Sequence, residues 1–125
     1  MRKLVVTSSV FLMVSGIVLA YPRLFPWAEE SSAVYLLHLW AGFLFLVIFP
    51  IYSWDHIKTH ANRLKKLSLL SLSGTLQLIT GLGLIISGLP LLIYGNDVFE
   101  LIGIIHFVLT FVLALCLILH KITRK

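Results

Sequence analysis

The chain has 125 residues, of which 59% are hydrophobic and only 12% charged, with a formal net charge of +5 and a mean hydropathy of +1.02. A soluble domain of this size would have too few polar side chains to cover its surface, so the composition excludes one and indicates an integral membrane protein. The basic residues are expected to set membrane topology and to meet anionic membrane lipid, with no nucleic-acid partner.

Four stretches without Asp, Glu, Lys or Arg each supply the roughly 20 apolar residues that a membrane-spanning helix needs. They predict an all-α fold, an integral membrane four-helix bundle that forms a single transmembrane domain over residues 1–125. The helices are expected at about residues 4–21, 33–56, 67–89 and 99–121.

The basic residues predict the orientation of these helices. Nine of the ten lie before the first helix, between the second and third, or after the fourth, and only Arg23 lies in the other loops. By the positive-inside rule, the N- and C-termini are expected to be cytoplasmic, in the cytoplasmic (inner) membrane of a bacterium or archaeon.

The first helix contains no histidine, and its small residues predict close packing against a neighbouring helix. These small residues are Ser8, Ser9, Ser15 and Gly16. The basic start, the apolar run and Val18-Leu19-Ala20 also resemble a secretory signal peptide, which stays open as an alternative.

Histidines interrupt the second and fourth apolar stretches. His38 and His56 are eighteen residues apart, five helical turns, so they share a face and lie about 27 Å apart. His106 and His120 are fourteen residues apart, which leaves them on one face within about 40° and about 21 Å apart. Both helices are expected to run from outside to inside. We therefore predict an outer pair of His38 with His106. The inner pair is His56 with His120.

Paired imidazoles in a membrane favour an iron site. An ionisable residue in hydrocarbon is costly and usually functional, and neutral histidine is a good iron ligand. Two facing histidines can hold a b-type haem if the helices leave a gap for the macrocycle. We therefore expect two haem b groups, with His38, His106, His56 and His120 as axial ligands of the iron. The glycines expected to clear the gap, or alternatively to pack helices, are Gly42, Gly74, Gly81 and Gly103, with Gly88 continuing the heptad of Gly74 and Gly81.

His60 is the alternative inner ligand. Using it in place of His56 doubles the height mismatch with the fourth helix to about 12 Å, so we favour His56. His60 would then contact a haem propionate or lie at the surface. A zinc site formed by His56 and His60 would need a third protein ligand. The nearby basic residues, which could pair with propionates or only set topology, are Lys58, Arg63, Lys65 and Lys66.

With this histidine spacing and the adjacent glycines, residues 33–121 resemble the small four-helix di-haem b-type cytochromes. This membrane cytochrome b subunit family includes the membrane subunits of formate dehydrogenases and nickel-iron hydrogenases and, more distantly, cytochrome b of quinol-oxidising complexes. The resemblance implies electron transfer across the membrane between quinone or quinol and a periplasmic or membrane redox subunit, with one haem near each face. A first helix without a ligand departs from the hydrogenase type and is closer to the pattern in which two helices supply both pairs.

Two other functions stay open: a haem-free structural membrane anchor subunit, and a stand-alone oxidoreductase acting on a small molecule such as superoxide. Proton-coupled transport is disfavoured because all five acidic residues lie at helix ends or in loops. With so little chain outside the membrane, we expect no catalytic residue. The chain should serve as an electron-transfer subunit of an oxidoreductase complex, or form a homo-oligomer.

Overall fold

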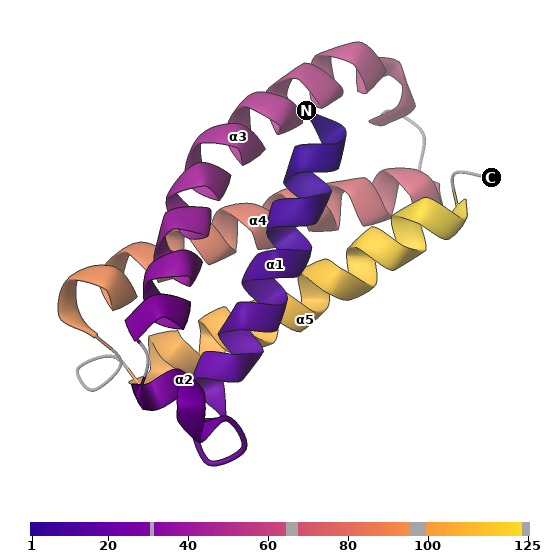
Figure 1. Cartoon of the computed structure of the whole chain (residues 1–125). Coiled ribbons are helices and arrows are strands. Elements are labelled where there is room, and N and C mark those ends of the chain that lie inside the picture. Colours follow the sequence, from indigo (N-terminus) through magenta and orange to yellow (C-terminus); the bar gives the residue numbers. More distant parts are fainter. Residues whose placement is uncertain (31, 65–67, 96–99, 124–125) are drawn as a thin grey trace. The chain divides into compact units, whose positions relative to one another are not determined.

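The computed structural model describes residues 1–30, 32–64, 68–95 and 100–123 (Figure 1). Within these ranges every regular element is a helix. The helices are α1 (Arg2–Ala20), α2 (Pro26–Glu30), α3 (Ser32–Leu64), α4 (Leu69–Tyr94) and α5 (Glu100–Thr123). All except α2 are long and apolar enough to cross a membrane. The predicted all-α class with four membrane-length helices is confirmed, and it fits a multi-pass membrane protein.

Two helices extend further than the sequence predicted. The second was expected to end near residue 56, but α3 continues through the polar segment to Leu64, with non-helical backbone angles at His60 (φ −117°, ψ 18°). The third was expected to end near residue 89, but α4 passes through Pro90 to Tyr94. A proline removes only one backbone donor, and such a break is tolerated within a membrane helix. The short helix α2, in the loop after α1, was not expected.

Local signals explain both ends of α4. Ser68 has an extended backbone, and its side chain accepts a hydrogen bond of 3.2 Å from the backbone N–H of Ser71. This is an N-cap, so the helix begins two residues later than expected. At the other end Gly95 adopts φ +73°, and its N–H donates to the Leu91 carbonyl at 3.0 Å. A left-handed glycine of this kind commonly ends a helix.

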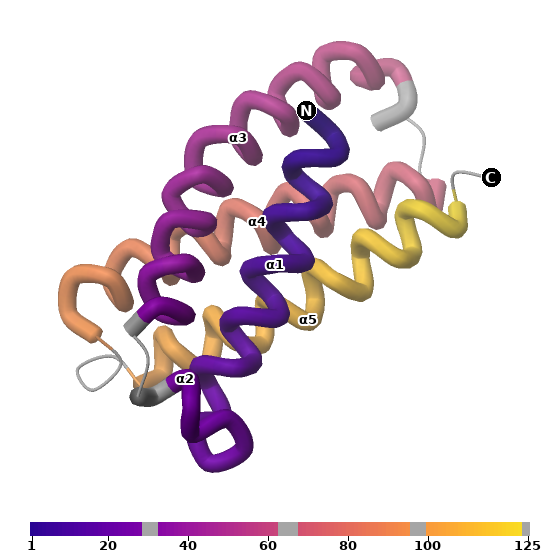
Figure 2. The backbone as a smooth tube through the Cα atoms, viewed as in Figure 1, coloured from indigo at the N-terminus to yellow at the C-terminus, as the bar shows by residue number. Residues whose placement is uncertain are grey.

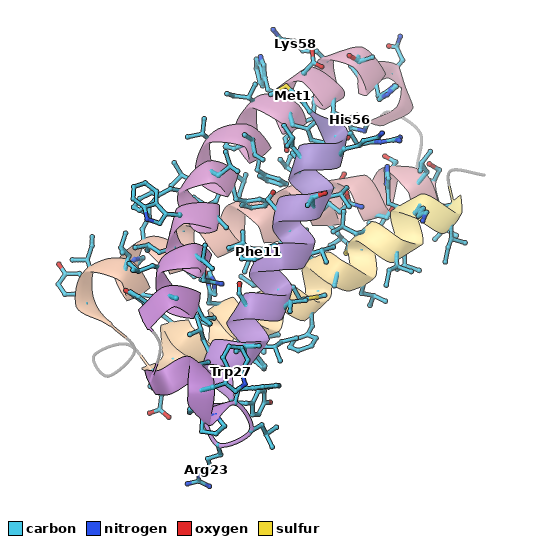
Figure 3. All side chains as sticks on the ribbon, viewed as in Figure 1. Met1, Phe11, Arg23, Trp27, His56 and Lys58 are labelled. Atoms are coloured by element: carbon cyan, nitrogen blue, oxygen red, sulfur yellow. The ribbon has the colours of Figure 1, made fainter. Side chains whose placement is uncertain are left out.

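The chain forms two compact units, residues 1–49 and residues 50–125, which divide at Pro50 within α3. The first unit contains α1, α2 and the first half of α3, and Figure 3 shows Arg23 and Trp27 at its α1–α2 turn. The second unit contains the remainder of α3 and the hairpin of α4 and α5. These two helices lie side by side and run antiparallel (Figures 1 and 2).

The buried side chains are unusual for so hydrophobic a chain, because many are small hydroxyl residues. They are Ser8, Ser9, Ser15, Ser73, Thr80 and Ser87. Each hydroxyl donates to a backbone carbonyl three or four residues earlier in its own helix, so no donor is left unsatisfied. Large apolar side chains instead lie exposed along all four long helices. This arrangement suits lipid outside and close helix contact inside.

Candidate functional site

Three of the histidines contact a neighbouring helix in the same way, through a Ser-Gly pair. In each case the imidazole Nδ1 lies within hydrogen-bonding distance of the serine Oγ. The three pairs are His38 with Ser15 at 2.8 Å, His106 with Ser87 at 2.8 Å, and His120 with Ser73 at 3.1 Å. All three rings are half-buried. One local arrangement therefore occurs once in the first unit and twice in the second.

The glycine that follows each serine lies against the same ring. A Cβ on Gly16 would come within 3.3 Å of His38 Cε1, and one on Gly88 within 3.3 Å of His106 Cε1. A Cβ on Gly74 would lie 3.4 Å from Cε1 of its histidine partner, His120. These glycines let the imidazole approach the helix backbone closely.

The four glycines predicted to line the site have different surroundings. The glycines were expected to clear space for a porphyrin or to pack helices, and at Gly74 the immediate neighbour is the imidazole of His120. Gly42 is the open position, because a Cβ there would meet no atom within 4 Å. Gly81 is buried in α4, and Gly103 is half-buried in α5.

The antiparallel register of α4 and α5 explains why two of these contacts form together. Ser73 and Ser87 are fourteen residues apart on α4, and His106 and His120 are fourteen residues apart on α5. Between them, Gln77 Nε2 donates to the backbone carbonyl of Cys116 at 2.8 Å. One register therefore aligns both histidines with their serines.

His56 lies beside His120 in the second unit. Their ring centroids are 6.3 Å apart, and the ring planes cross at 68°. His56 also stacks on Tyr52, at 5.6 Å and 20°, and meets His60 edge-on at 4.6 Å. Figure 3 shows His56 towards the C-terminal end of α3, with Lys58 close by along the helix.

The rings of His56 and His120 are close enough that the two side chains could bind one metal ion between them. Metal–imidazole bonds are about 2.0 Å long and each ring nitrogen lies about 1 Å from its ring centre, so two such rings have centroids about 6 Å apart. The described residues contain no group of three or more His, Cys, Asp or Glu side chains that could hold a metal. A zinc site would need a third protein ligand, whereas a haem would need two.

The two outer histidines belong to different units, His38 to the first and His106 to the second. The structure describes the surroundings of each ring within its own unit, and the predicted pairing of His38 with His106 stays a prediction. Both follow their serine in the chain by a similar interval, 23 residues for His38 and 19 for His106. Each serine lies towards the end of one long helix, and each histidine lies in the first turns of the next.

No protein-family model, curated protein or solved structure matches this chain. The function is therefore inferred from the geometry of its own residues.

Among the predicted propionate partners, Lys58 is described, with its Nζ 5.0 Å from the centroid of the Trp54 ring. A cation over an indole face, where the apolar run of α3 ends, suits the membrane interface. The side chains of Arg63, Lys65 and Lys66 lie outside the described residues.

The three serines were not predicted to be histidine partners. Ser15 was expected to pack helices together, and Ser73 and Ser87 had no predicted role. A signal was present, because the sequence contains three Ser-Gly pairs and each of them holds a histidine.

Proposed function

We propose that this chain is a membrane b-type cytochrome that carries electrons across the membrane through two bis-histidine haems. His56 and His120 would hold the inner haem. The single observation that carries the proposal is the 6.3 Å between these two ring centroids, the spacing of two ligands that share a metal. A haem held by two histidines accepts and releases single electrons, and the protein tunes its potential through ligands, hydrogen bonds and burial.

His38 and His106 would hold the outer haem. Their equivalent contacts support this assignment, because each donates or accepts a 2.8 Å hydrogen bond with a serine and rests against a glycine. Under the predicted topology both lie near the outer face. Two histidines with like contacts and like predicted depth are suited to bind the same cofactor.

The proposed family is the small four-helix di-haem b-type cytochromes of bacterial or archaeal inner membranes. Electrons would pass between the quinone pool and a periplasmic or membrane redox subunit. Exposed apolar side chains such as Leu37, Val47, Ile79 and Ile118 supply faces for lipid, for that subunit or for a second copy of the chain.

The first test is a reduced-minus-oxidised visible spectrum of the purified protein, with a pyridine haemochrome assay that counts haem b per chain. We expect two haems. Alanine in place of any one ligand should leave one haem, and His60→Ala is the matched control that should retain two. The four ligand variants are His38→Ala, His56→Ala, His106→Ala and His120→Ala. Absence of haem after expression with adequate haem supply would overturn the proposal in favour of a haem-free membrane anchor.

A second measurement separates electron transfer with quinol from small-molecule chemistry. Protein in lipid vesicles is mixed with a soluble quinol analogue, and haem reduction is followed by stopped-flow spectroscopy. We expect quinol to reduce the haems, and the His106→Ala variant to lose the outer signal. Rapid oxidation by superoxide without any reduction by quinol would instead indicate a stand-alone oxidoreductase.

A further inference from the structure

We infer that Ser15, Ser73 and Ser87 are positioning residues that fix the tautomer and ring orientation of His38, His120 and His106, so that Nε2 is the nitrogen presented to iron. The role in haem binding rests on the proposed function, whereas the tautomer is a property of the protein alone.

Each serine hydroxyl has a single proton and can donate one hydrogen bond. A backbone carbonyl can only accept a hydrogen bond, so the proton between a serine and a carbonyl belongs to the serine. Ser15 Oγ lies 2.8 Å from the Phe11 carbonyl oxygen, and Ser87 Oγ lies 2.7 Å from that of Gly83. Ser73 Oγ lies 3.0 Å from the carbonyl oxygen of its own helix at Leu70.

Each hydroxyl proton is therefore directed to the helix backbone, and the serine oxygen accepts the hydrogen bond from the imidazole. The donor must then be the histidine Nδ1–H. A neutral imidazole carries one ring proton, so protonation at Nδ1 leaves the lone pair on Nε2. The chain of bonds runs from Nδ1–H to Oγ, and from Oγ–H to the carbonyl.

This is the arrangement that a metal-binding histidine needs. Such a histidine usually donates its second ring N–H to a fixed acceptor, which sets the tautomer, orients the ring and raises the basicity of the ligating nitrogen. Here the glycine supplies a second constraint, because the ring edge at Cε1 already rests on the neighbouring helix. These two contacts on adjacent ring atoms help to orient each imidazole before any cofactor binds, and His106 has a further hydrogen bond with the backbone of Leu84.

The arrangement distinguishes the two proposed haem sites. At the outer site both ligands, His38 and His106, are held by serines. At the inner site Ser73 holds His120, while His56 packs on Tyr52 and His60. Loss of Ser15 or Ser87 should therefore alter the outer haem, and loss of Ser73 the inner one.

The tautomers are tested in the full chain expressed without haem, with ¹⁵N-labelled histidine, in detergent micelles. The ¹⁵N shifts of the imidazoles should report Nδ1–H for His38, His106 and His120. Ser87→Ala should redistribute the tautomers of His106, whereas Ser87→Thr should restore Nδ1–H. Ser8→Ala is the matched control, because Ser8 is also buried and bonded to a carbonyl of its own helix, that of Val5.

The same variants are then titrated with haem and poised at known potentials. Each serine-to-alanine change should weaken haem binding at its site by about 10-fold to 100-fold. It should also raise the midpoint potential of that haem, because a less basic ligand stabilises ferric iron less. Threonine should restore both properties, and Ser8→Ala should change neither.

Two results would overturn the inference: Nε2–H tautomers in the haem-free protein, or serine-to-alanine variants whose potentials match that of Ser8→Ala. A protein that shows the three Nδ1–H tautomers but binds no haem would support the role of the serines in orienting the rings. It would count against the proposed cytochrome function instead.

Discussion

The imidazoles of His56 and His120 lie with their ring centroids 6.3 Å apart on two different helices, α3 and α5, of one compact unit. His60, one turn further along α3, touches His56 edge-on at a point where the helix backbone departs from regular geometry. The sequence left His56 and His60 as alternatives for the inner site. The His56 ring lies beside that of His120, and under the proposed function His56 is the ligand.

Replacement of His56 by methionine tests this choice without removing the ligand altogether. A His/Met haem has a higher potential than a bis-histidine haem, so His56→Met should retain the inner haem with a raised midpoint potential. His60→Met should leave both potentials as they are. Potentiometric titration of the visible bands measures both variants, and a raised potential in His60→Met alone would make His60 the ligand.

Gly88 offers a steric test of the outer site. An alanine Cβ would come within 3.3 Å of His106 Cε1 and push the ring away from Ser87. Overpacking of this kind costs about 1–3 kcal/mol, so Gly88→Ala should weaken outer haem binding by roughly 5-fold to 150-fold. Gly83→Ala is the matched control, because its Cβ would also crowd a side chain of α5, Leu109 at 3.0 Å, without reaching a histidine. Equal haem titrations for the two variants would contradict the prediction.

Gly42 should behave differently, because a Cβ there meets no atom within 4 Å. A side chain should therefore be accommodated at this position, and Gly42→Leu should leave the helical circular dichroism of the protein without haem unchanged. If the open space one turn beyond His38 receives the porphyrin, the same leucine should prevent the outer haem from binding. Haemochrome counting together with circular dichroism checks this, and a fully loaded Gly42→Leu protein would remove Gly42 from the site.

The four membrane-length helices could be predicted because the length of each apolar stretch can be counted in the sequence. The helix ends could not, because hydropathy and helix formation are different properties. Asp55 and Lys58 end the apolar run because their charged side chains favour water. Neither residue prevents helix formation, so α3 continues past them. Pro90 reads as a stop signal, yet the helix continues to Gly95, whose positive φ ends it.

The serine contacts were harder to predict for another reason. A serine in an apolar helix indicates close packing, and its partner is set by the register of a second helix that a single sequence does not state. The spacing did carry the information, because Ser73 and Ser87 repeat the fourteen-residue interval of His106 and His120. Because the two intervals are equal and the helices are antiparallel, the register that brings Ser87 to His106 also brings Ser73 to His120.

Gln77 tests how strongly the α4–α5 hairpin is held between its two histidines. Its side-chain amide donates to the Cys116 carbonyl across the hairpin at 2.8 Å. Side-chain hydrogen bonds between membrane helices contribute about 0.6 kcal/mol on average and up to about 2 kcal/mol, so Gln77→Met should lower the unfolding free energy by that amount. Unfolding by sodium dodecyl sulfate in mixed micelles measures it. The control is Thr75→Val, because the exposed Thr75 hydroxyl donates to the Ser71 carbonyl of its own helix. An equal loss of unfolding free energy in both variants would contradict a role for Gln77 in holding the hairpin.

Arg23 and Thr59 test the predicted orientation, which decides the membrane face near which each proposed haem site lies. Both side chains are exposed, Arg23 at the α1–α2 turn (Figure 3) and Thr59 in the second half of α3. Because nine of ten basic residues share the opposite side from Arg23, a membrane-impermeant maleimide should label Arg23→Cys in intact cells and Thr59→Cys only after permeabilisation. The buried Cys116 is first replaced by alanine so that each variant has one thiol. The reverse labelling pattern would contradict the predicted orientation and would place His38 and His106 near the cytoplasmic face.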